Sequence, residues 1–427
     1  MTPPPAPAEA TGATAGAGAG AGAAANAGTN AGTADRARSG TSATGTSAPG
    51  SGTTATGGGK VQGQGPRLDL SQAARPGASL ETRIGLAVQG VRLTAPVRRT
   101  AGAGPSDDGH VVLGGRGAAL PIVATSRYEV NAGRLLYDGT DLGVPVEPVR
   151  RPRFYDLVTA DGVPYEQIAR LHGADVLATT VLQTCVRYQE PDRCRFCAIE
   201  ESLRSGATTR LKTPAQLAEV ARAAVQLDGV RQMVMTTGST AAPDRGARLL
   251  AEATRAVLAA VPGLPVQVQC EPPGDLAVLS ELRAAGASAI GIHIESLDDA
   301  VRARWTPGKA TVPLAAYEAA WAEAVRVFGR NRVSTYLLVG LGEDPDELVV
   351  GAERLIGMGV YPFVVPFRPL GGTLAARDGA RAPDAGVVAD VTRRVAAALR
   401  AAGMRGADQG AGCAACGACS ALPEAGG

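Results

Sequence analysis

The sequence lacks the features that mark membrane, secreted and nucleic-acid-binding proteins. Its 427 residues carry 42 basic and 40 acidic side chains, a net charge of +2. No long basic run or aromatic-studded basic stretch is present, so we expect no nucleic-acid partner. No run of about 18 apolar residues could cross a bilayer, and no leucine-rich segment follows a basic start, so we expect no membrane association.

Histidine is scarce, and the three histidines, His110, His172 and His293, do not pair at the spacing of metal ligands. His172 precedes Gly173 and is predicted to lie in the last turn of a helix. His293 alternates with Glu295, so both side chains should point to one face of a strand. On the inside of a barrel His293 would contact substrate or cofactor; a hydrogen-bonded core histidine is the alternative.

The seven cysteines are clustered rather than spread in pairs, unlike those of a disulfide-stapled secreted domain. This favours a reducing, cytoplasmic location. Three lie within thirteen residues, and three more lie near the C-terminus. The first group is Cys185, Cys194 and Cys197, and the second is Cys413, Cys416 and Cys419.

Composition divides the chain into four segments. Residues 1–66 are nearly all Ala, Gly, Thr, Ser and Pro and offer little to bury, which predicts a disordered tail; a transit peptide is the less favoured alternative. Residues 67–152 hold short apolar runs between turn clusters, typical of a small β-rich N-terminal domain. Residues 153–403 form an α/β region, and residues 404–427 a cysteine-rich C-terminal segment.

From residue 153 onward, apolar strands alternate with amphipathic helices. Thr213, Pro214 and Gln216 mark one helix start with a capping box. The βα unit recurs about six times, which predicts one parallel sheet and a partial (βα)6 TIM-like barrel with reactive groups at the carboxyl ends of its strands. The six strands are predicted to end at Gln183, Gly238, Pro272, Ser296, Gly340 and Pro369.

The first cysteine group follows the first predicted strand, at the mouth of this barrel. Thiolates bind metals, and Arg193 and Arg195 are expected to favour the thiolate form. Three thiolates leave one position open on a four-iron cluster, which is useful if a substrate or cofactor occupies it. The alternative is a zinc-stabilised binding or scaffold protein. Its structural zinc site would use Cys194, Cys197, Cys413 and Cys416.

The loop CRFC, in which Phe196 precedes the last cysteine, resembles the end of the cluster loop of radical S-adenosylmethionine (SAM) enzymes. The resemblance implies a [4Fe-4S] cluster on Cys185, Cys194 and Cys197 whose open iron is chelated by SAM. An electron from a donor such as flavodoxin or ferredoxin would cleave SAM to methionine and a 5′-deoxyadenosyl radical, which would abstract hydrogen from a small-molecule substrate.

The first cysteine gap departs from the family pattern. Eight residues separate Cys185 from Cys194, whereas the superfamily usually has three there. The longer gap and the C-terminal CxxCGxC run resemble one radical SAM subfamily whose genes lie near nitrilase genes.

The resemblance also assigns SAM contacts to strand ends. MTTGST lies where the superfamily has a Gly-Gly-Glu turn, so Thr237 and Gly238 would offer carbonyl groups to the SAM amino group, while Ser239 replaces the acid. Glu295 and Ser296 would bond the ribose or methionyl group. The structural alternatives are a simple turn after the strand and a helix-capping acid.

The segment LLVGLGE resembles the pattern that lies against adenine in these enzymes. Leu338, Gly340 and Glu343 match it, and Tyr336 replaces the first glycine. Phe196 is assigned to the same cofactor site.

The second cysteine group has the spacing of ferredoxin-type runs and is predicted to bind a second iron–sulfur cluster. A zinc knuckle or a flexible reducing tail are the alternatives. Cys270 could supply a fourth ligand, although a lone strand cysteine is usually a buried apolar residue. Glu271 and Arg368 are candidate substrate contacts, but the substrate itself does not follow from the sequence.

Overall fold

The computed structural model describes residues 78–93 and 110–425, which belong to the compact unit Gln64–Gly427. The predicted disordered tail at 1–66 and the predicted turn cluster at 101–109 lie outside the described residues. Across the two described ranges, every helix is too short or too polar to span a membrane.

A seven-stranded sheet in the order β13-β12-β11-β10-β9-β8-β7 carries the site. The strands β8 to β13 pair in parallel and in chain order, as a repeated βα unit requires. This confirms the predicted partial (βα)6 barrel. The strands are β7 (Arg170–His172), β8 (Val176–Thr180), β9 (Gln232–Thr236), β10 (Val266–Gln269), β11 (Ala289–Gly291), β12 (Val333–Val339) and β13 (Val360–Pro366).

Strand β7 was not predicted, and it corrects the expectation for His172. β7 pairs antiparallel with β8, and His172 is its last residue rather than the end of a helix. Gly173 has φ +68°, so it serves a tight turn between two strands instead of a helix C-cap.

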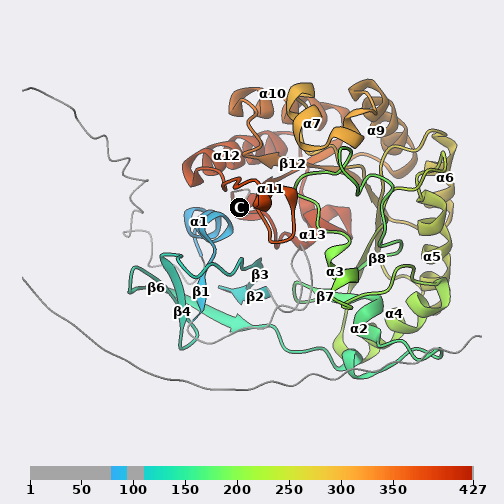
Figure 1. Ribbon diagram of the computed structural model, residues 1–427, viewed down its shortest axis with the longest axis horizontal. Coiled ribbons are helices and arrows are strands. Elements are labelled where there is room, and N and C mark those ends of the chain that lie inside the picture. Colours follow the sequence, from blue (N-terminus) through green and yellow to red (C-terminus); the bar gives the residue numbers. More distant parts are fainter. Residues whose placement is uncertain (1–77, 94–109, 426–427) are drawn as a thin grey trace, which may run out of the picture. The chain divides into compact units, whose positions relative to one another are not determined.

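The long helices lie outside the sheet (Figure 1). Helix α4 begins as predicted, because Thr213 Oγ1 accepts from Gln216 N–H (3.2 Å) and Gln216 Oε1 accepts from Thr213 N–H (2.9 Å). In the core, Trp321 Nε1 donates to Ile292 O (3.0 Å). These helices are α4 (Pro214–Asp228), α5 (Ala247–Ala260), α6 (Ala277–Ala284), α9 (Leu314–Phe328), α10 (Pro345–Met358) and α12 (Ala385–Ala401).

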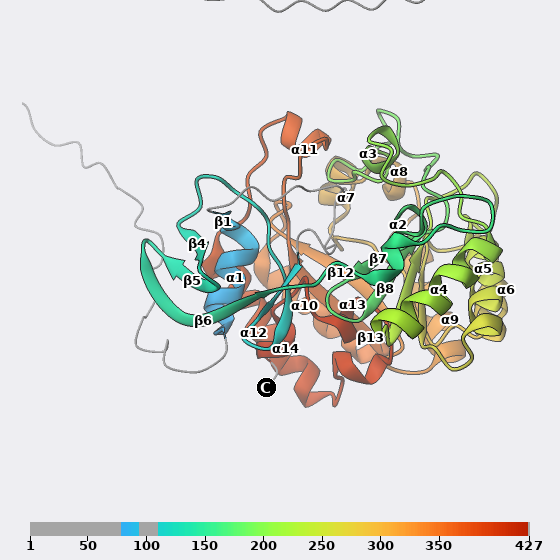
Figure 2. The same cartoon turned by 90° about the horizontal axis from the view of Figure 1, so that it is seen from below.

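The short segments gather at two ends of the barrel. Figure 2 shows α3, α7, α8 and α11 together on one side, and α13 and α14 on the opposite side. The first group follows the carboxyl ends of β8, β11 and β13. Their bounds are α2 (Tyr165–Ile168), α3 (Glu201–Arg204), α7 (Asp299–Trp305), α8 (Pro307–Ala310), α11 (Leu374–Arg377), α13 (Cys413–Cys416) and α14 (Leu422–Ala425), with 3-10 turns η3 (Arg153–Asp156) and η4 (Gly406–Gln409).

The N-terminal part is β-rich, as expected, with a six-stranded sheet in the order β1-β4-β5-β6-β2-β3. The helix α1 (Leu80–Gln89) was not predicted; Ser79 caps it, and its residues Ile84 and Leu86 join the barrel core and the core of this sheet respectively. The strands are β1 (Arg92–Leu93), β2 (His110–Leu113), β3 (Arg116–Ala119), β4 (Tyr128–Asn131), β5 (Arg134–Tyr137) and β6 (Thr140–Pro148).

Candidate active site

The first cysteine group lies on a loop between β8 and α3, at the carboxyl end of the barrel. Backbone hydrogen bonds hold this loop from two sides. Arg195 N–H donates to Trp305 O of α7 (2.8 Å), and Ala375 N–H of α11 donates to Arg195 O (2.8 Å). Gly308 N–H of α8 donates to Asp192 O (3.0 Å). The segments that follow β11 and β13 therefore position the loop.

Cys185, Cys194 and Cys197 line one cavity of about 190 Å³. Burial raises the pKa of Cys197 to about 11 and raises the pKa of Cys194 well above its ordinary value. Arg193 donates to Cys197 O (3.0 Å), and Arg195 forms an ion pair with an aspartate. Arg193 does lower the pKa of Cys197, but burial outweighs this effect, so both Cys194 and Cys197 are held as thiols. A cluster that binds here must itself displace the thiol protons.

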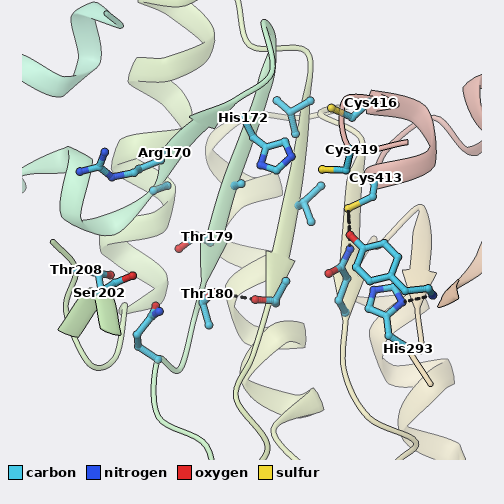
Figure 3. A pocket seen from close by; sticks show the side chains of 18 of the residues that line it. Arg170, His172, Thr179, Thr180, Ser202, Thr208, His293, Cys413, Cys416 and Cys419 are labelled. Atoms are coloured by element: carbon cyan, nitrogen blue, oxygen red, sulfur yellow. Dashed lines mark hydrogen bonds between the residues drawn. The ribbon is translucent and has the colours of Figure 1, made fainter. Parts of the chain in front are cut away.

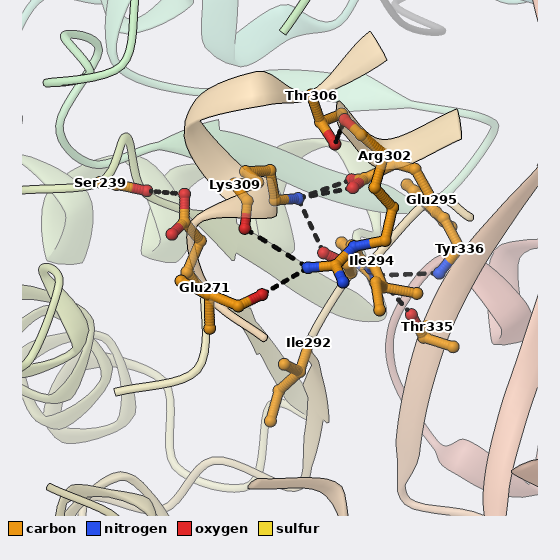
Figure 4. Close-up of polar contacts among 12 residues, drawn as sticks. Ser239, Glu271, Ile292, Ile294, Glu295, Arg302, Thr306, Lys309, Thr335 and Tyr336 are labelled. Atoms are coloured by element: carbon orange, nitrogen blue, oxygen red, sulfur yellow. Dashed lines mark hydrogen bonds and ion pairs between the residues drawn. The ribbon is translucent and has the colours of Figure 1, made fainter. Parts of the chain in front are cut away.

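Glu271, just after β10, anchors the cysteine loop. Its carboxylate accepts from Arg187 Nε (3.0 and 3.2 Å) and from Ser239 Oγ (2.6 Å), and Arg245 Nη1 lies 3.3 Å away. These donors satisfy the carboxylate, so Glu271 ties the loop residue Arg187 to the barrel rather than standing free for substrate. Ser239, which replaces the acid of the family turn, is engaged with Glu271 (Figure 4).

Glu295 forms a buried ion pair that the sequence did not predict. Lys309 Nζ donates to both oxygens of Glu295 (2.8 and 2.7 Å), as Figure 4 shows. It also donates to His293 O (2.7 Å). Burial lowers the pKa of Lys309, but the Glu295 carboxylate outweighs this and holds the pKa above its ordinary value. Glu295 also has φ +69°, an uncommon conformation for a residue with a side chain. No periodicity in the sequence marks Lys309, which lies in a four-residue helix.

Thr237 and Gly238 lie at the wall of the smaller cavity, as predicted for strand-end residues. Gly238 also has a packing role, because a Cβ added there would lie 2.1 Å from Thr184 O. Thr184 directly precedes Cys185, so the absence of a side chain at Gly238 lets β9 approach the start of the cysteine loop.

The remaining predicted cofactor residues divide into two kinds. Phe196 lines the smaller cavity and also a second, larger cavity inside the barrel, and Leu338 lines the larger cavity. Gly340 lies in the turn after β12 with φ +105°, and its N–H donates to Glu343 Oε1 (2.7 Å). Ser296 is buried, and its Oγ accepts from the N–H of the residue two positions later (3.3 Å). Gly340 and Ser296 thus make local turn contacts, and neither lines these two cavities.

A larger cavity of about 550 Å³ adjoins the first inside the barrel. The second cysteine group lies in its wall (Figure 3). Both predicted cysteine groups therefore face adjoining cavities. The two cavities share the lining residues Phe196, Thr236, Gln269, His293 and Glu295.

Buried glutamines at the starts of β9 and β10 hold the C-terminal turn. Gly412 N–H donates to Gln232 Oε1 (2.8 Å), and Cys413 N–H donates to Gln267 Oε1 (3.4 Å). Gln232 is the first residue of β9, and Gln267 is the second of β10. The turn therefore packs at the amino end of the sheet, opposite the first cysteine group, and forms the floor of the barrel.

His293 and His172 both line the larger cavity, so His293 faces the barrel interior. Burial is the main cause that lowers the pKa of each to about 3, so both are neutral near pH 7. His293 Nδ1 accepts from Tyr336 N–H (3.2 Å), while its buried Nε2 has no hydrogen-bond partner among the described residues. His172 lies against His110, with ring centroids 5.2 Å apart.

Lys212, which sequence reasoning missed, also lines the larger cavity and is only 1% exposed. Its Nζ donates to Gln183 Oε1 (2.8 Å) and Thr209 O (2.9 Å), both neutral acceptors. Burial lowers the pKa of Lys212 from its ordinary 10.5 to about 7. Lys212 stands just before a helix cap, where no apolar pattern distinguishes an inward side chain from a solvated one.

The cysteine arrangement excludes the four-thiolate zinc site. Cys194 and Cys197 line the smaller cavity, whereas Cys413 and Cys416 line the larger one. Within residues 78–93 and 110–425, no three His, Cys, Asp or Glu side chains are grouped closely enough to hold a single metal ion. The cysteines of an iron–sulfur cluster bind different irons and stand further apart, so each group of three thiols facing one cavity still fits such a cluster.

The two further candidates, Cys270 and Arg368, line different cavities. Cys270 lines the smaller cavity with the first cysteine group, so it is not brought to the second group as a fourth ligand. Arg368 lines the larger cavity, and its Nε donates to Ala87 O of α1 (3.0 Å). Arg368 therefore links the barrel to the N-terminal part of the chain.

Residues 191–355 match the family described as the radical SAM superfamily. This segment is a radical SAM domain. A radical SAM domain is an enzyme domain. The matched residues include Cys194 and Cys197 of the cysteine loop, the strands β9 to β12, and the ion pair of Glu295 with Lys309. Cys185 and the second cysteine group lie outside the matched segment.

Several solved structures show a weak likeness to the chain. Methylornithine synthase is 16% identical over 59% of this chain and 70% of its own, with a TM-score of 0.39. A radical SAM methyltransferase from Sphaerobacter thermophilus is 18% identical over 58% and 70%, with a TM-score of 0.41. The [FeFe]-hydrogenase maturase HydG is 16% identical over 53% of this chain and 49% of its own, with a TM-score of 0.39. No curated protein sequence matches the chain.

Proposed function

We propose that this radical SAM domain binds a [4Fe-4S] cluster through Cys185, Cys194 and Cys197 and uses it to cleave SAM. The observation that supports this most is the placement of three thiols on one loop, at the carboxyl end of a parallel half-barrel, facing one cavity. When bound, such a cluster supplies the electron that converts SAM to methionine and a 5′-deoxyadenosyl radical.

The chain's own residues would hold SAM and substrate in adjoining spaces. Thr237, Gly238 and Glu295 line the smaller cavity beside the cysteine loop and are proposed to hold the polar end of SAM. Leu338 and Phe196 line the larger cavity and are proposed to pack against its adenosyl part. Because Glu295 is already paired with Lys309, an ionised Glu295 can accept from ribose hydroxyl groups without leaving a lone buried charge. The rest of the larger cavity would take the small-molecule substrate.

We further propose that Cys413, Cys416 and Cys419 bind a second iron–sulfur cluster in the barrel floor. Support comes from the thiols lining the larger cavity and from the hydrogen bonds that hold their turn against β9 and β10. The eight-residue gap and the CxxCGxC run also lead us to propose membership of the radical SAM subfamily whose genes lie near nitrilase genes. Finding no nitrilase gene beside this gene and its relatives would count against that subfamily.

Cluster reduction requires a partner, and we propose flavodoxin or ferredoxin as the electron donor. All seven cysteines are free thiols, which agrees with a proposed cytoplasmic location.

Electron paramagnetic resonance of the reduced protein tests the SAM site. After anaerobic reconstitution with iron and sulfide, adding SAM should change the signal of the cluster at Cys185, Cys194 and Cys197. Replacing these three residues with Ala should remove that SAM-dependent signal, whereas the matched triple replacement at Cys413, Cys416 and Cys419 should retain it. A wild-type signal that does not respond to SAM would contradict the proposal.

A further inference from the structure

Cys413 is the one cysteine of the second group whose sulfur receives side-chain hydrogen bonds in the described part of the chain. Tyr336 Oη donates to Cys413 Sγ at 2.7 Å, and Gln269 Nε2 donates to the same sulfur at 3.4 Å. The sulfurs of Cys416 and Cys419 have no such side-chain donor among residues 78–93 and 110–425. One sulfur of the group therefore accepts side-chain hydrogen bonds that the other two sulfurs lack.

The phenol of Tyr336 is held in place from both sides. Its ring stacks on His293, with centroids 4.0 Å apart and planes 5° from parallel, and it also contacts the ring of Phe363 at 5.5 Å. Tyr336 N–H donates to His293 Nδ1 (3.2 Å), which fixes the imidazole as well. With the ring fixed in this way, the hydroxyl of Tyr336 is directed at Cys413 Sγ.

Gln269 is fixed in the same way. Its Nε2 donates to Gln267 Oε1 (2.8 Å) as well as to Cys413 Sγ, and Gln267 Nε2 lies 3.3 Å from Ser334 Oγ. Because both amide hydrogens of Gln269 are engaged, its direction toward the sulfur is set by the network and not by solvent. Both donors are thus arranged before any ligand binds.

We propose that Tyr336 and Gln269 raise the reduction potential of the cluster at Cys413, Cys416 and Cys419 by hydrogen-bonding the Cys413 sulfur. This inference rests on the proposed second cluster. A reduced cluster carries one more negative charge than an oxidised one, so donors to a ligand sulfur stabilise the reduced state more. Tyr336 and Gln269 are positioning residues here, since they act through Cys413.

Tyr336 thereby has a role that the resemblance to radical SAM enzymes does not imply. In the sequence, Tyr336 is notable only because it stands at a position where the family pattern has glycine. In the structure this position faces the floor of the barrel, where a glycine would provide no donor to the sulfur.

The test measures a potential rather than activity. The first cysteine group is replaced with Ala, so that the second cluster alone contributes to the spectrum, and the full chain is reconstituted anaerobically. Tyr336→Phe is then compared with this parent by spectroscopic titration against redox mediators. At a fixed solution potential, we expect the ratio of reduced to oxidised cluster to fall about tenfold in Tyr336→Phe. This corresponds to a reduction potential that is lower by about 59 mV for a one-electron couple. Gln269→Leu should shift it in the same direction by less, because its contact is longer.

Tyr317→Phe is the matched control, since its buried hydroxyl has no hydrogen-bond partner among the described residues and should leave the potential unchanged. If the parent binds no iron, the proposed second cluster is absent and this inference is wrong with it, whereas SAM cleavage at the first cysteine group is not affected. If iron is bound but neither Tyr336→Phe nor Gln269→Leu lowers the potential, the second cluster stands and this inference is wrong.

Discussion

At the scale of single residues, the ion pair of Glu295 and Lys309 carries a direct energetic consequence. Both side chains are almost fully buried, with 10% and 13% of their side-chain surfaces exposed. Lys309→Met should therefore lower the free energy of unfolding by about 3–5 kcal/mol, because it leaves a buried carboxylate without its partner. Denaturant unfolding of the metal-free protein measures this loss.

The double variant Lys309→Met/Glu295→Gln supplies the control for that prediction. Removing the charge of Glu295 as well should recover much of the lost stability, since no unpaired charge is then buried. If the single and double variants had equal free energies of unfolding, the Glu295 carboxylate would have to be solvated or protonated. That result would contradict a buried ion pair with Lys309.

Lys212 predicts a pH dependence of stability. Its pKa is about 7 in the folded protein and ordinarily 10.5, so between these values the unfolded chain binds more protons than the folded chain. The contribution of Lys212 to the free energy of unfolding therefore rises with pH across this window, by at most about 1.4 kcal/mol per pH unit. Denaturant unfolding of wild type and Lys212→Met measures this contribution. From pH 7 to pH 9 the free energy of unfolding of the wild type should increase relative to that of the variant. A difference that does not change with pH would mean that Lys212 keeps its ordinary pKa.

Some charged residues of the site could be predicted from the sequence, and others could not. Glu295 was identified at the end of a predicted strand; in the structure β11 ends earlier, at Gly291, and Glu295 lines the smaller cavity. Lys309 and Lys212 lie in a short helical turn and before a helix cap, so neither belongs to a pattern that reveals which way its side chain points. Only the fold turns these two lysines inward.

At the scale of elements, two glycines mark where strands and turns approach each cysteine group. A Cβ at Gly238 would lie 2.1 Å from the backbone oxygen of Thr184, which directly precedes Cys185. Gly238→Ala should therefore displace the start of the cysteine loop and remove the first cluster, about four iron atoms per chain. Iron and sulfide analysis after reconstitution measures this loss.

Gly412 is the equivalent position for the second group. Its φ is +109°, and a Cβ there would lie 2.2–2.3 Å from the side-chain amide of Gln267, which is fully buried. Gly412→Ala should remove the second cluster and retain the SAM-dependent signal of the first. The reverse pattern, or loss of both clusters, would contradict the separate placement of the two groups.

Gly357→Ala is a common control for both glycine variants. Gly357 lies in α10, and a Cβ there would meet no atom within 4 Å. Ala should stabilise this helix by about 0.5–1 kcal/mol and leave the iron content unchanged.

Elements with strong local signals could be predicted, and those without could not. The capping box of α4 and the six parallel strands were predicted from short stretches of sequence. Strand β7 was missed because its three residues are too short to show alternation. The turn that includes Gly173 also resembles a helix end, since both need a glycine at positive φ.

At the scale of the whole molecule, the two cysteine groups face adjoining cavities from opposite ends of one barrel. The spacing of the cysteines predicted two separate groups, but not that the second forms the barrel floor. That placement depends on Gln232 and Gln267, which are far from Cys413 along the chain, and a single sequence does not reveal such pairings.

Formation of 5′-deoxyadenosine reports SAM cleavage at Cys185, Cys194 and Cys197. Wild-type protein, reconstituted anaerobically, reduced with dithionite and given SAM, should release 5′-deoxyadenosine, as should the Ala variant of Cys413, Cys416 and Cys419. The Ala variant of Cys185, Cys194 and Cys197 should release none. Release of 5′-deoxyadenosine by this last variant, or no release by fully reconstituted wild type, would show that these three cysteines do not hold the cluster that cleaves SAM.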